Sequence, residues 1–435
     1  VWTGYSGGRR FNCRRFAVQD RTNNCYGCGY GVIGGLHVKK MFRYLAGGLG
    51  GVPLDPYTGL VATRCLAPIS RNGTYKQLMA RSPHYSRTAI TSLQIVIPNW
   101  YVNPASTHAE LGAGADATVT ASIEYPAGTF TQILFSGVAA GTVPNIGQLL
   151  SDVCTVTIPD NTLFWVRIFW DCPGSGGVLT VGHDLDGASR PGCGLEVAVS
   201  GLTDKTMSGT VVGADNEFSP VAIIGTTTKR SVVIVGDSIG LGDTTREVVG
   251  DISGDFGVVA RSIGPNYAYA SYCQNGDQGE DFIASHTNRV ALFPYASDLI
   301  CEYGNNDVWT NSAAVATVQT ILQTIWAYMT DLGPEKKAHQ ITITTRTTSS
   351  DNFATAGNQT SVSAPNEGRR ITLNAWLRTI PAGLTGCCDI TTVLETGLGT
   401  GRWITDGGAN TYTPDGTHPN TASSILVRDS GVVRI

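Results

Sequence analysis

Charged side chains, methionines and long apolar runs are all scarce in this 435-residue sequence. Charged residues make up 15% of the chain and hydrophobic residues 42%, a balance that excludes an intrinsically disordered protein. A membrane-spanning helix needs an apolar run of about 18 residues, and because the sequence has none we expect no transmembrane helix. A chain of this length is expected to form two or three domains around hydrophobic cores.

Cysteine, in contrast, is abundant. So many cysteines favour an oxidising compartment with several disulfides and at least one unpaired thiol, and hence an extracellular location or a cell or virion surface. A zinc site built on Cys25-Tyr-Gly-Cys28, with Cys13 and Cys65 nearby, is an alternative, less favoured because no second Cys-x-x-Cys or paired histidines accompany it. Cys301 lies in an apolar run and is expected to be a buried thiol. The 11 cysteines are Cys13, Cys25, Cys28, Cys65, Cys154, Cys172, Cys193, Cys273, Cys301, Cys387 and Cys388.

The net charge of −4 hides a strong asymmetry along the chain. Between Val1 and Ile95 there are 13 Lys or Arg residues against Asp20 and Asp55, which gives +11 and leaves −15 for the remainder. Such a basic segment suits a polyanion (nucleic acid, an acidic polysaccharide or a membrane surface) or an acidic protein. The alternative is that it packs on the acidic remainder of its own chain or of a neighbouring subunit, which leaves a homo-oligomer open.

The first half of the chain divides into two segments. Glycine-rich turns interrupt residues 1–90 and predict an irregular basic arm with one short helix at 37–45. Residues 91–229 predict an all-β sandwich of jelly-roll type, a candidate carbohydrate-binding or assembly domain. We expect Trp165 in its core. Trp100 and Trp170 are candidates for exposed sugar-binding rings, with core packing the favoured alternative for each. The expected strands are 93–98, 118–125, 129–135, 154–158, 163–170, a strand near 178, 195–199 and 221–224.

After a linker at 226–230, strands alternate with helices as far as residue 435. This pattern predicts an α/β domain at 230–435, with a parallel sheet between two helical layers. The expected strands are 232–235, 256–259, 298–302, 340–344 and 389–393, and the expected helices are 312–332 and 369–380. Removal of residues 1–90 is therefore expected to leave the chemistry of this domain nearly intact.

Three short blocks in the α/β segment carry residues suited to acyl transfer. In Ser231-Val-Val-Ile-Val-Gly-Asp-Ser-Ile239, four β-branched residues predict a buried strand that places Ser238 at its carboxyl end, where open α/β sheets bind ligands. Gly304-Asn-Asn-Asp307 and Asp415-Gly-Thr-His418 follow far downstream. Each block alone is also typical of an ordinary turn.

A serine hydroxyl attacks an acyl carbon well only when a base removes its proton. His418 is the candidate base for Ser238. Asp415, three residues before it, could accept the Nδ1 proton and stabilise the imidazolium that forms.

In this order the three blocks resemble the SGNH (GDSL-type) hydrolase family, whose signature is a Gly-Asp-Ser block, a Gly-x-Asn-Asp block and a late Asp-x-x-His. The resemblance covers residues 230–435 and does not extend to the first half. It implies a flavodoxin-like three-layer fold and a serine nucleophile that uses no metal or organic cofactor. It also implies Ser238, Asp415 and His418 as the catalytic residues.

The same resemblance implies an oxyanion hole with three donors. These are the Ser238 N–H, the Asn306 side-chain amide and a glycine N–H that follows the second strand. Gly264 in Arg261-Ser-Ile-Gly-Pro-Asn266 is the expected match, although the commoner motif ends in Gly-Asp. Asp237 and Asp307 are expected to hold their loops by side-chain to backbone hydrogen bonds.

The implied reaction is hydrolysis of an ester through an acyl group on Ser238. Family members act on acetylated polysaccharides, short acyl esters, lipids and thioesters. The sandwich and the cysteines favour removal of O-acetyl groups from a carbohydrate; a general short-chain esterase is the next choice, and a lipase is disfavoured because no long apolar lid is visible. A different class is a virion or surface assembly protein, whose hydrolase domain is an accessory glycan-trimming or glycan-binding module.

Overall fold

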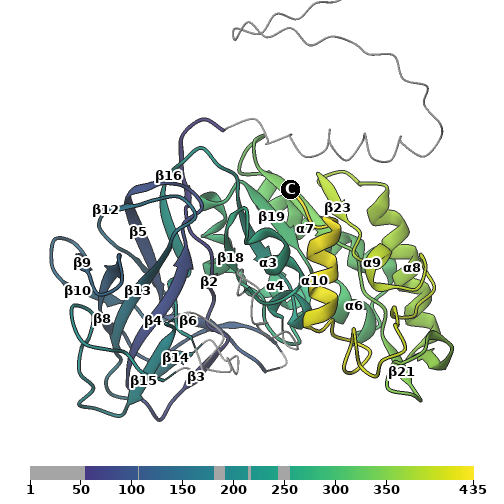
Figure 1. The fold of residues 1–435 in the computed structure, drawn as a ribbon, viewed down its shortest axis with the longest axis horizontal. Coiled ribbons are helices and arrows are strands. Elements are labelled where there is room, and N and C mark those ends of the chain that lie inside the picture. The colour runs from purple at the N-terminus through teal and green to yellow at the C-terminus, as the bar shows by residue number, and fades with distance from the viewer. Residues whose placement is uncertain (1–53, 106, 181–191, 214–216, 243–254) are drawn as a thin grey trace, which may run out of the picture. The chain divides into compact units, whose positions relative to one another are not determined.

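Two antiparallel sheets form the first half of the computed structural model, which describes residues 54–105, 107–180, 192–213, 217–242 and 255–435 (Figure 1). One sheet has the order β10-β8-β13-β4-β15, and β9 also pairs with β8. The other has the order β1-β16-β5-β11, and β12 also pairs with β5. The first sheet contains β4 (Gln77–Tyr85), β8 (Ala117–Glu124), β9 (Phe130–Ile133), β10 (Ala140–Val143), β13 (Leu163–Asp171) and β15 (Gly194–Ala198). The second contains β1 (Tyr57–Leu60), β5 (Ile90–Pro98), β11 (Gln148–Leu150), β12 (Cys154–Ile158) and β16 (Ala222–Thr227).

The two sheets bury their apolar side chains in one cluster. Ile95 and Ile97 of β5 and Phe164 and Val166 of β13 are all fully buried members of it. Alternate residues of β13 therefore point inward, as a strand with one face on a core requires. This two-sheet arrangement is a sandwich; its jelly-roll topology stays a prediction.

The prediction that the chain is irregular as far as residue 90 is wrong for residues 57–90. Strand β4 is nine residues long and pairs with β13 on one side and β15 on the other. Its sequence includes Arg81 and Pro83 and gives a weak strand signal, so its conformation is set by the two neighbours rather than by local preference. The expected helix at 37–45 lies outside the described residues, and a truncation at residue 90 would remove part of the sandwich.

The structure confirms core packing for Trp100 and Trp170 and contradicts the expectation that Trp165 lies in the core. Trp100 and Trp170 are fully buried, so neither offers an exposed ring to a sugar. Trp165 is half-buried, and the Arg81 guanidinium lies 4.0 Å from its ring centroid. The alternation of β13 was therefore predicted with its faces exchanged, because Phe164, Val166 and Trp170 all point into the core.

A parallel sheet forms the second half, with the order β2-β18-β17-β19-β20-β23. Apart from β2, this is the doubly wound order of flavodoxin-like folds. The edge strand β2 comes from Cys65–Leu66, which lies between the sandwich strands β1 and β4 in the sequence. The remaining strands are β17 (Ser231–Val235), β18 (Ala268–Ser271), β19 (Asp298–Cys301), β20 (Lys337–Ile341) and β23 (Gly386–Cys388).

Three strands of this sheet lie close to their predicted positions and two do not. The segment expected as a strand at 256–259 enters helix α3 (Val258–Ile263), and the second strand is β18. The strand expected at 389–393 is replaced by β23 and helix α9 (Thr391–Leu394). Both errors arise where short apolar runs suit a helix or a strand equally well.

Helices cover both faces of the parallel sheet, as predicted. Val232 and Ile234 of β17 pack with residues of α3, α9 and α10 (Thr421–Ser430), whereas Val233 and Val235 belong to the cluster that includes α7 (Val315–Thr330) and α8 (Ala364–Arg378). The predicted linker corresponds to the short connection between β16 and β17. The other helices are α2 (Ser238–Leu241), α4 (Gly279–Ala284), α5 (Thr287–Val290), α6 (Asn305–Trp309), η2 (Phe293–Tyr295) and η3 (Ala356–Asn358). The other strands are β3 (Ser70–Asn72), β6 (Trp100–Val102), β7 (Glu110–Gly112), β14 (Val178–Thr180), β21 (Thr347–Ser349) and β22 (Gln359–Ser361).

The disulfide prediction fails for the cysteines whose pairing the structure describes. Cys301 is a fully buried thiol, as expected, and burial raises its pKa well above the ordinary value. Most of these thiols fill space in the two cores, as small hydrophobic side chains do. The thiols without a disulfide are Cys65, Cys154, Cys172, Cys273, Cys301, Cys387 and Cys388, while Cys13, Cys25 and Cys28 lie outside the described residues. The described helices include none long and apolar enough to cross a membrane.

Candidate functional site

Ser238 is the first residue of helix α2, directly after strand β17. The side chain of Asp237 caps this helix by accepting the Ile239 N–H at 2.9 Å. Gly236 is needed in the turn because a Cβ there would lie 2.5 Å from the Glu302 Oε2 atom. The turn therefore presents the half-buried Ser238 hydroxyl at the carboxyl edge of the sheet.

His418 lies against Ser238, although 180 residues separate them in the sequence. Its Nε2 atom is 2.8 Å from the Ser238 Oγ atom, and its Nδ1 atom is 2.7 Å from the Asp415 Oδ2 atom. The Asp415 Oδ1 atom accepts the N–H groups of Thr417 and His418 at 2.8 and 2.9 Å. Burial raises the pKa of Asp415, but the hydrogen bonds from His418 and Thr417 outweigh it and bring the pKa to about 2. Asp415 is thus an anion at neutral pH.

The loop that carries this pair is fixed by Gly416. Its φ angle is +75°, and a Cβ there would lie 1.9 Å from the Thr347 carbonyl oxygen. The Gly416 carbonyl oxygen accepts hydrogen bonds from the Thr347 N–H and the buried Trp403 indole. A larger residue at position 416 would therefore move Asp415 and His418 together.

Asn306 lies at the start of helix α6, after strand β19. Its Nδ2 atom donates to the Asp277 carbonyl oxygen at 3.1 Å and to the Asp237 Oδ2 atom at 3.3 Å. The structure therefore places Asn306 beside the turn that carries Ser238. Asp307, the next residue, accepts the Gly279 N–H at 3.2 Å and so joins α6 to α4, and its burial raises its pKa to about 6.

The prediction that Gly264 supplies an oxyanion donor is wrong. Its N–H donates to the Ala260 carbonyl oxygen at 2.8 Å, and its carbonyl accepts from Arg87, so the residue is engaged at the end of α3. The misplaced second strand caused the error. After the true second strand, β18, the sequence reads Asn275-Gly-Asp277. This Gly-Asp pair is the signal that could have identified Gly276 as the candidate for the glycine donor.

Gly276 lies in a turn connected to the other parts of the site. The Gln274 N–H donates to the Gly236 carbonyl oxygen at 3.1 Å, and Asp277 accepts from Asn306 through its own carbonyl. The φ angle of Gly276 is +76°, which favours glycine. We call residues 274–281 the second-block turn.

Two further residues were missed in the sequence. Glu302, at the end of β19, is fully buried and accepts the N–H groups of Asp237 and Gly240 at 2.9 and 3.2 Å. Burial and the neighbouring Asp237 carboxyl raise its pKa well above the ordinary value. Arg346 donates from Nη2 to the Asn306 Oδ1 atom at 3.3 Å and interacts electrostatically with Asp237 and Asp415. Neither residue belongs to a local motif, so only the folded sheet identifies them.

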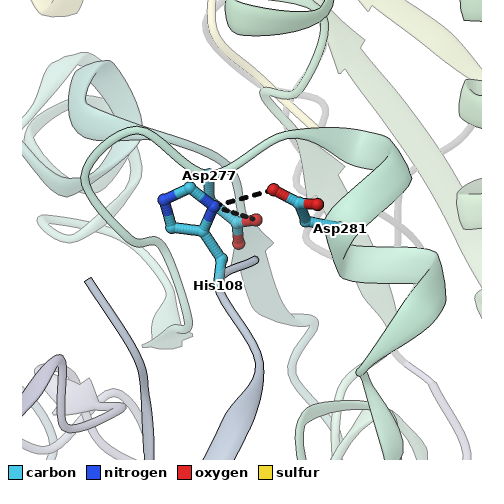
Figure 2. A group of neighbouring side chains, drawn as sticks. All are labelled: His108, Asp277 and Asp281. Carbon is cyan, nitrogen blue, oxygen red and sulfur yellow. Dashed lines mark hydrogen bonds and ion pairs between the residues drawn. The ribbon is translucent and has the colours of Figure 1, made fainter. Parts of the chain in front are cut away.

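His108, Asp277 and Asp281 form a cluster beside the second-block turn (Figure 2). The His108 Nδ1 atom lies 2.8 Å from Asp281 Oδ2 and 3.9 Å from Asp277 Oδ1. Three groups of this kind can hold a metal ion, but Asp277 already accepts from Arg289 at 2.9 Å and from the Tyr303 hydroxyl at 2.6 Å. The positive charge of Arg289 opposes a cation there, so we interpret the cluster as a set of hydrogen bonds and ion pairs.

Comparison with known proteins gives similarity to solved hydrolase structures over about half of the chain. A lipase/acylhydrolase from Enterococcus faecalis is 18% identical, with 47% of this chain and 93% of the other covered and a TM-score of 0.31. A GDSL-like lipase from Bacteroides thetaiotaomicron is 14% identical, with 46% and 87% covered and a TM-score of 0.29. An α/β hydrolase from the metagenome of Lake Arreo is 16% identical, with 47% and 97% covered and a TM-score of 0.32. No protein-family model and no curated protein matches the sequence.

Proposed function

We propose that the chain is a serine esterase that hydrolyses short acyl esters through an acyl group on Ser238. The observation that carries the proposal is the continuous contact from the Ser238 hydroxyl to His418 and on to Asp415, at 2.8 and 2.7 Å. A surface histidine in an ordinary turn would not meet both a strand-end serine and a carboxylate in this order.

The reaction proceeds by two displacements. Ser238 Oγ attacks the acyl carbon while His418 Nε2 takes its proton, and Asp415 stabilises the imidazolium. The imidazolium then protonates the departing alcohol. In the second displacement His418 deprotonates a water molecule that attacks the acyl carbon, and it returns this proton to Ser238 Oγ as the acid leaves. The oxyanion is bound by the N–H groups of Ser238 and Gly276 and by the Asn306 amide, which exchanges its 3.3 Å hydrogen bond to Asp237 Oδ2 for one to the oxyanion. Each such donor contributes about 3 kcal/mol to transition-state stabilisation.

We propose an O-acetylated carbohydrate as the substrate. The sandwich contains a pocket of about 380 Å³ whose lining includes Arg81, Glu124, Phe130 and Arg167. Both guanidiniums pair with Glu124 and Arg167 lies over the Phe130 ring, so a sugar would bind this charged cluster through hydrogen bonds. The described thiols without a disulfide give no support to an extracellular or surface location, which stays a prediction. Eight of the 13 basic residues before residue 96 precede residue 54, outside the described part, and their binding to a polyanion or an acidic protein stays a prediction.

Hydrolysis of p-nitrophenyl acetate and butyrate by the wild type and Ser238→Ala tests the esterase, and acetate release from acetylated glycans tests the substrate class. We expect activity that disappears with Ser238→Ala and acetate release from at least one glycan. A folded wild type that neither turns over these esters nor reacts with a fluorophosphonate at Ser238 would overturn the esterase. Ester turnover without acetate release from any glycan would overturn only the proposal that the substrate is an acetylated carbohydrate.

A further inference from the structure

A loop of the first half of the chain reaches the second-block turn. His108 lies between strands β6 and β7, and its Nδ1 atom contacts Asp281 at 2.8 Å (Figure 2). A Cβ at Gly276 would lie 3.2 Å from the His108 Nε2 atom, so the ring also packs directly on the glycine. His108 is 5% exposed and thus fills the space above the turn.

Glu110, two residues later, holds the same region from another side. Its carboxylate accepts the N–H groups of Asn288 and Arg289 and the Arg289 Nε–H, at 2.7, 3.0 and 3.2 Å. The Arg289 Nη1 atom then donates to the Asp277 side chain at 2.9 Å. A carboxylate from the first half is therefore joined through one buried guanidinium to the residue after Gly276.

Gln274 gives a third connection at the start of the turn. Its side-chain amide donates to the carbonyl oxygens of Ile69 and Val102, both from the first half of the chain, and the Ile69 distance is 2.9 Å. The turn is thus held at Gln274, Asp277 and Asp281, with Gly276 between them. Such fixed geometry is what an oxyanion donor requires, because a displacement of about 1 Å can cost about a hundredfold in rate.

We propose that His108 is a positioning residue for the oxyanion hole, supplied to the hydrolase sheet by the β6–β7 loop. This inference rests on the proposed esterase function. His108 acts through the second-block turn: its contacts with Asp281 and Gly276 keep the Gly276 N–H and the Asp277 carbonyl in place, and that carbonyl in turn orients the Asn306 amide. It does not touch the substrate.

Two substitutions at position 108 separate this role from a general packing role. The φ angle of His108 is +41°, so His108→Gly suits the backbone but removes the ring, and His108→Asn suits it and keeps a donor near the position of Nδ1. Asp281→Ala removes the same hydrogen bond from the other side. His286→Asn is the control, because the His286 ring bonds the Ile283 carbonyl and stacks on Tyr328, and both residues lie outside the second-block turn.

We expect His108→Gly and Asp281→Ala to lower kcat on p-nitrophenyl acetate about tenfold to a hundredfold, with KM changed less than about twofold. His108→Asn should restore kcat to within about threefold of the wild type, and His286→Asn should leave it unchanged. Hydrogen exchange, followed by mass spectrometry of peptides over residues 274–281, should accelerate in the two damaging variants and in neither of the others.

The two readouts distinguish the possible failures. Wild-type kcat in a folded His108→Gly protein, or equal losses in the glycine and asparagine variants, would overturn the positioning role. Absence of turnover in the wild type would overturn the esterase itself, and hydrogen exchange would then decide alone whether His108 anchors the turn. Unchanged exchange in His108→Gly would refute the anchor in either case.

Discussion

Asp415→Asn should reduce the activity more than Asp415→Ala does, because the two carboxylate oxygens of Asp415 have different partners. Oδ1 accepts two backbone N–H groups and Oδ2 accepts from His418 Nδ1. In Asp415→Asn the two backbone donors hold the single amide oxygen, which turns the NH2 group towards Nδ1. Since an NH2 group only donates, the imidazole proton moves to Nε2, where His418 can no longer accept the proton of Ser238.

The structure also gives the expected magnitudes. Although burial raises the pKa of Asp415, its hydrogen bonds lower it from 3.8 to about 2, which corresponds to roughly 2 kcal/mol. Because the side chain is 45% exposed, solvent screening reduces this to about 1 kcal/mol. Asp415→Ala should therefore lose about five- to tenfold in kcat/KM. For His418 to accept the proton of Ser238, the Asp415→Asn side chain must turn its oxygen towards Nδ1 and its NH2 group towards the N–H groups of Thr417 and His418. This loses two hydrogen bonds at about 1 kcal/mol each, so the total loss in kcat/KM should be roughly two hundredfold.

Steady-state hydrolysis of p-nitrophenyl acetate at pH 7 to 8 measures both losses, and melting temperatures show whether the variants fold. Asp406→Asn is the matched control, because Asp406 is exposed in the same segment and its carboxylate accepts hydrogen bonds from the Gly408 N–H and the Thr411 side chain. An asparagine variant as active as the alanine variant, or more active, would refute the assigned roles of the two oxygens.

Two further predictions concern stability. Because the pKa of buried Glu302 is raised in the folded protein, this carboxyl group contributes stability that is fully present below about pH 4.5 and is lost as the pH rises through its folded-state pKa. Glu302→Gln has no such titration, so its melting temperature relative to that of the wild type should rise between pH 5 and pH 8. A melting-temperature difference that does not depend on pH would contradict a raised pKa. A chain that begins at residue 230 lacks β2, His108 and Arg64. The Arg64 Nε atom lies 3.1 Å from the buried Asp255 carboxylate, and loss of Arg64 would leave that charge without this partner. Since such a loss costs about 3 to 5 kcal/mol, the shorter chain should unfold. A chain that begins at residue 54 should melt cooperatively by circular dichroism, and independent folding of the shorter chain would contradict this dependence.

The sequence predicts the contact among Ser238, His418 and Asp415 well because its signals are local. Asp415 and His418 are three residues apart, and Ser238 follows four β-branched residues whose burial is evident from composition. The second-block turn was missed because β18 reads Ala-Tyr-Ala-Ser, a weak strand pattern that becomes a strand only between β17 and β2. Likewise His108 lies 173 residues from Asp281, and no local pattern connects them.

The buried charges around Asp277 support a positional function for the contact between the two halves. Burying Asp277, Arg289 and Glu110 together is costly, and such networks often add little net stability compared with apolar packing. What they do provide is fixed geometry, because the guanidinium bonds both carboxylates through planar, directed N–H groups. An apolar contact of the same size would hold the halves together but would leave the Gly276 N–H free to shift. The placement of this network beside a proposed oxyanion donor is therefore explained better by positioning than by stability.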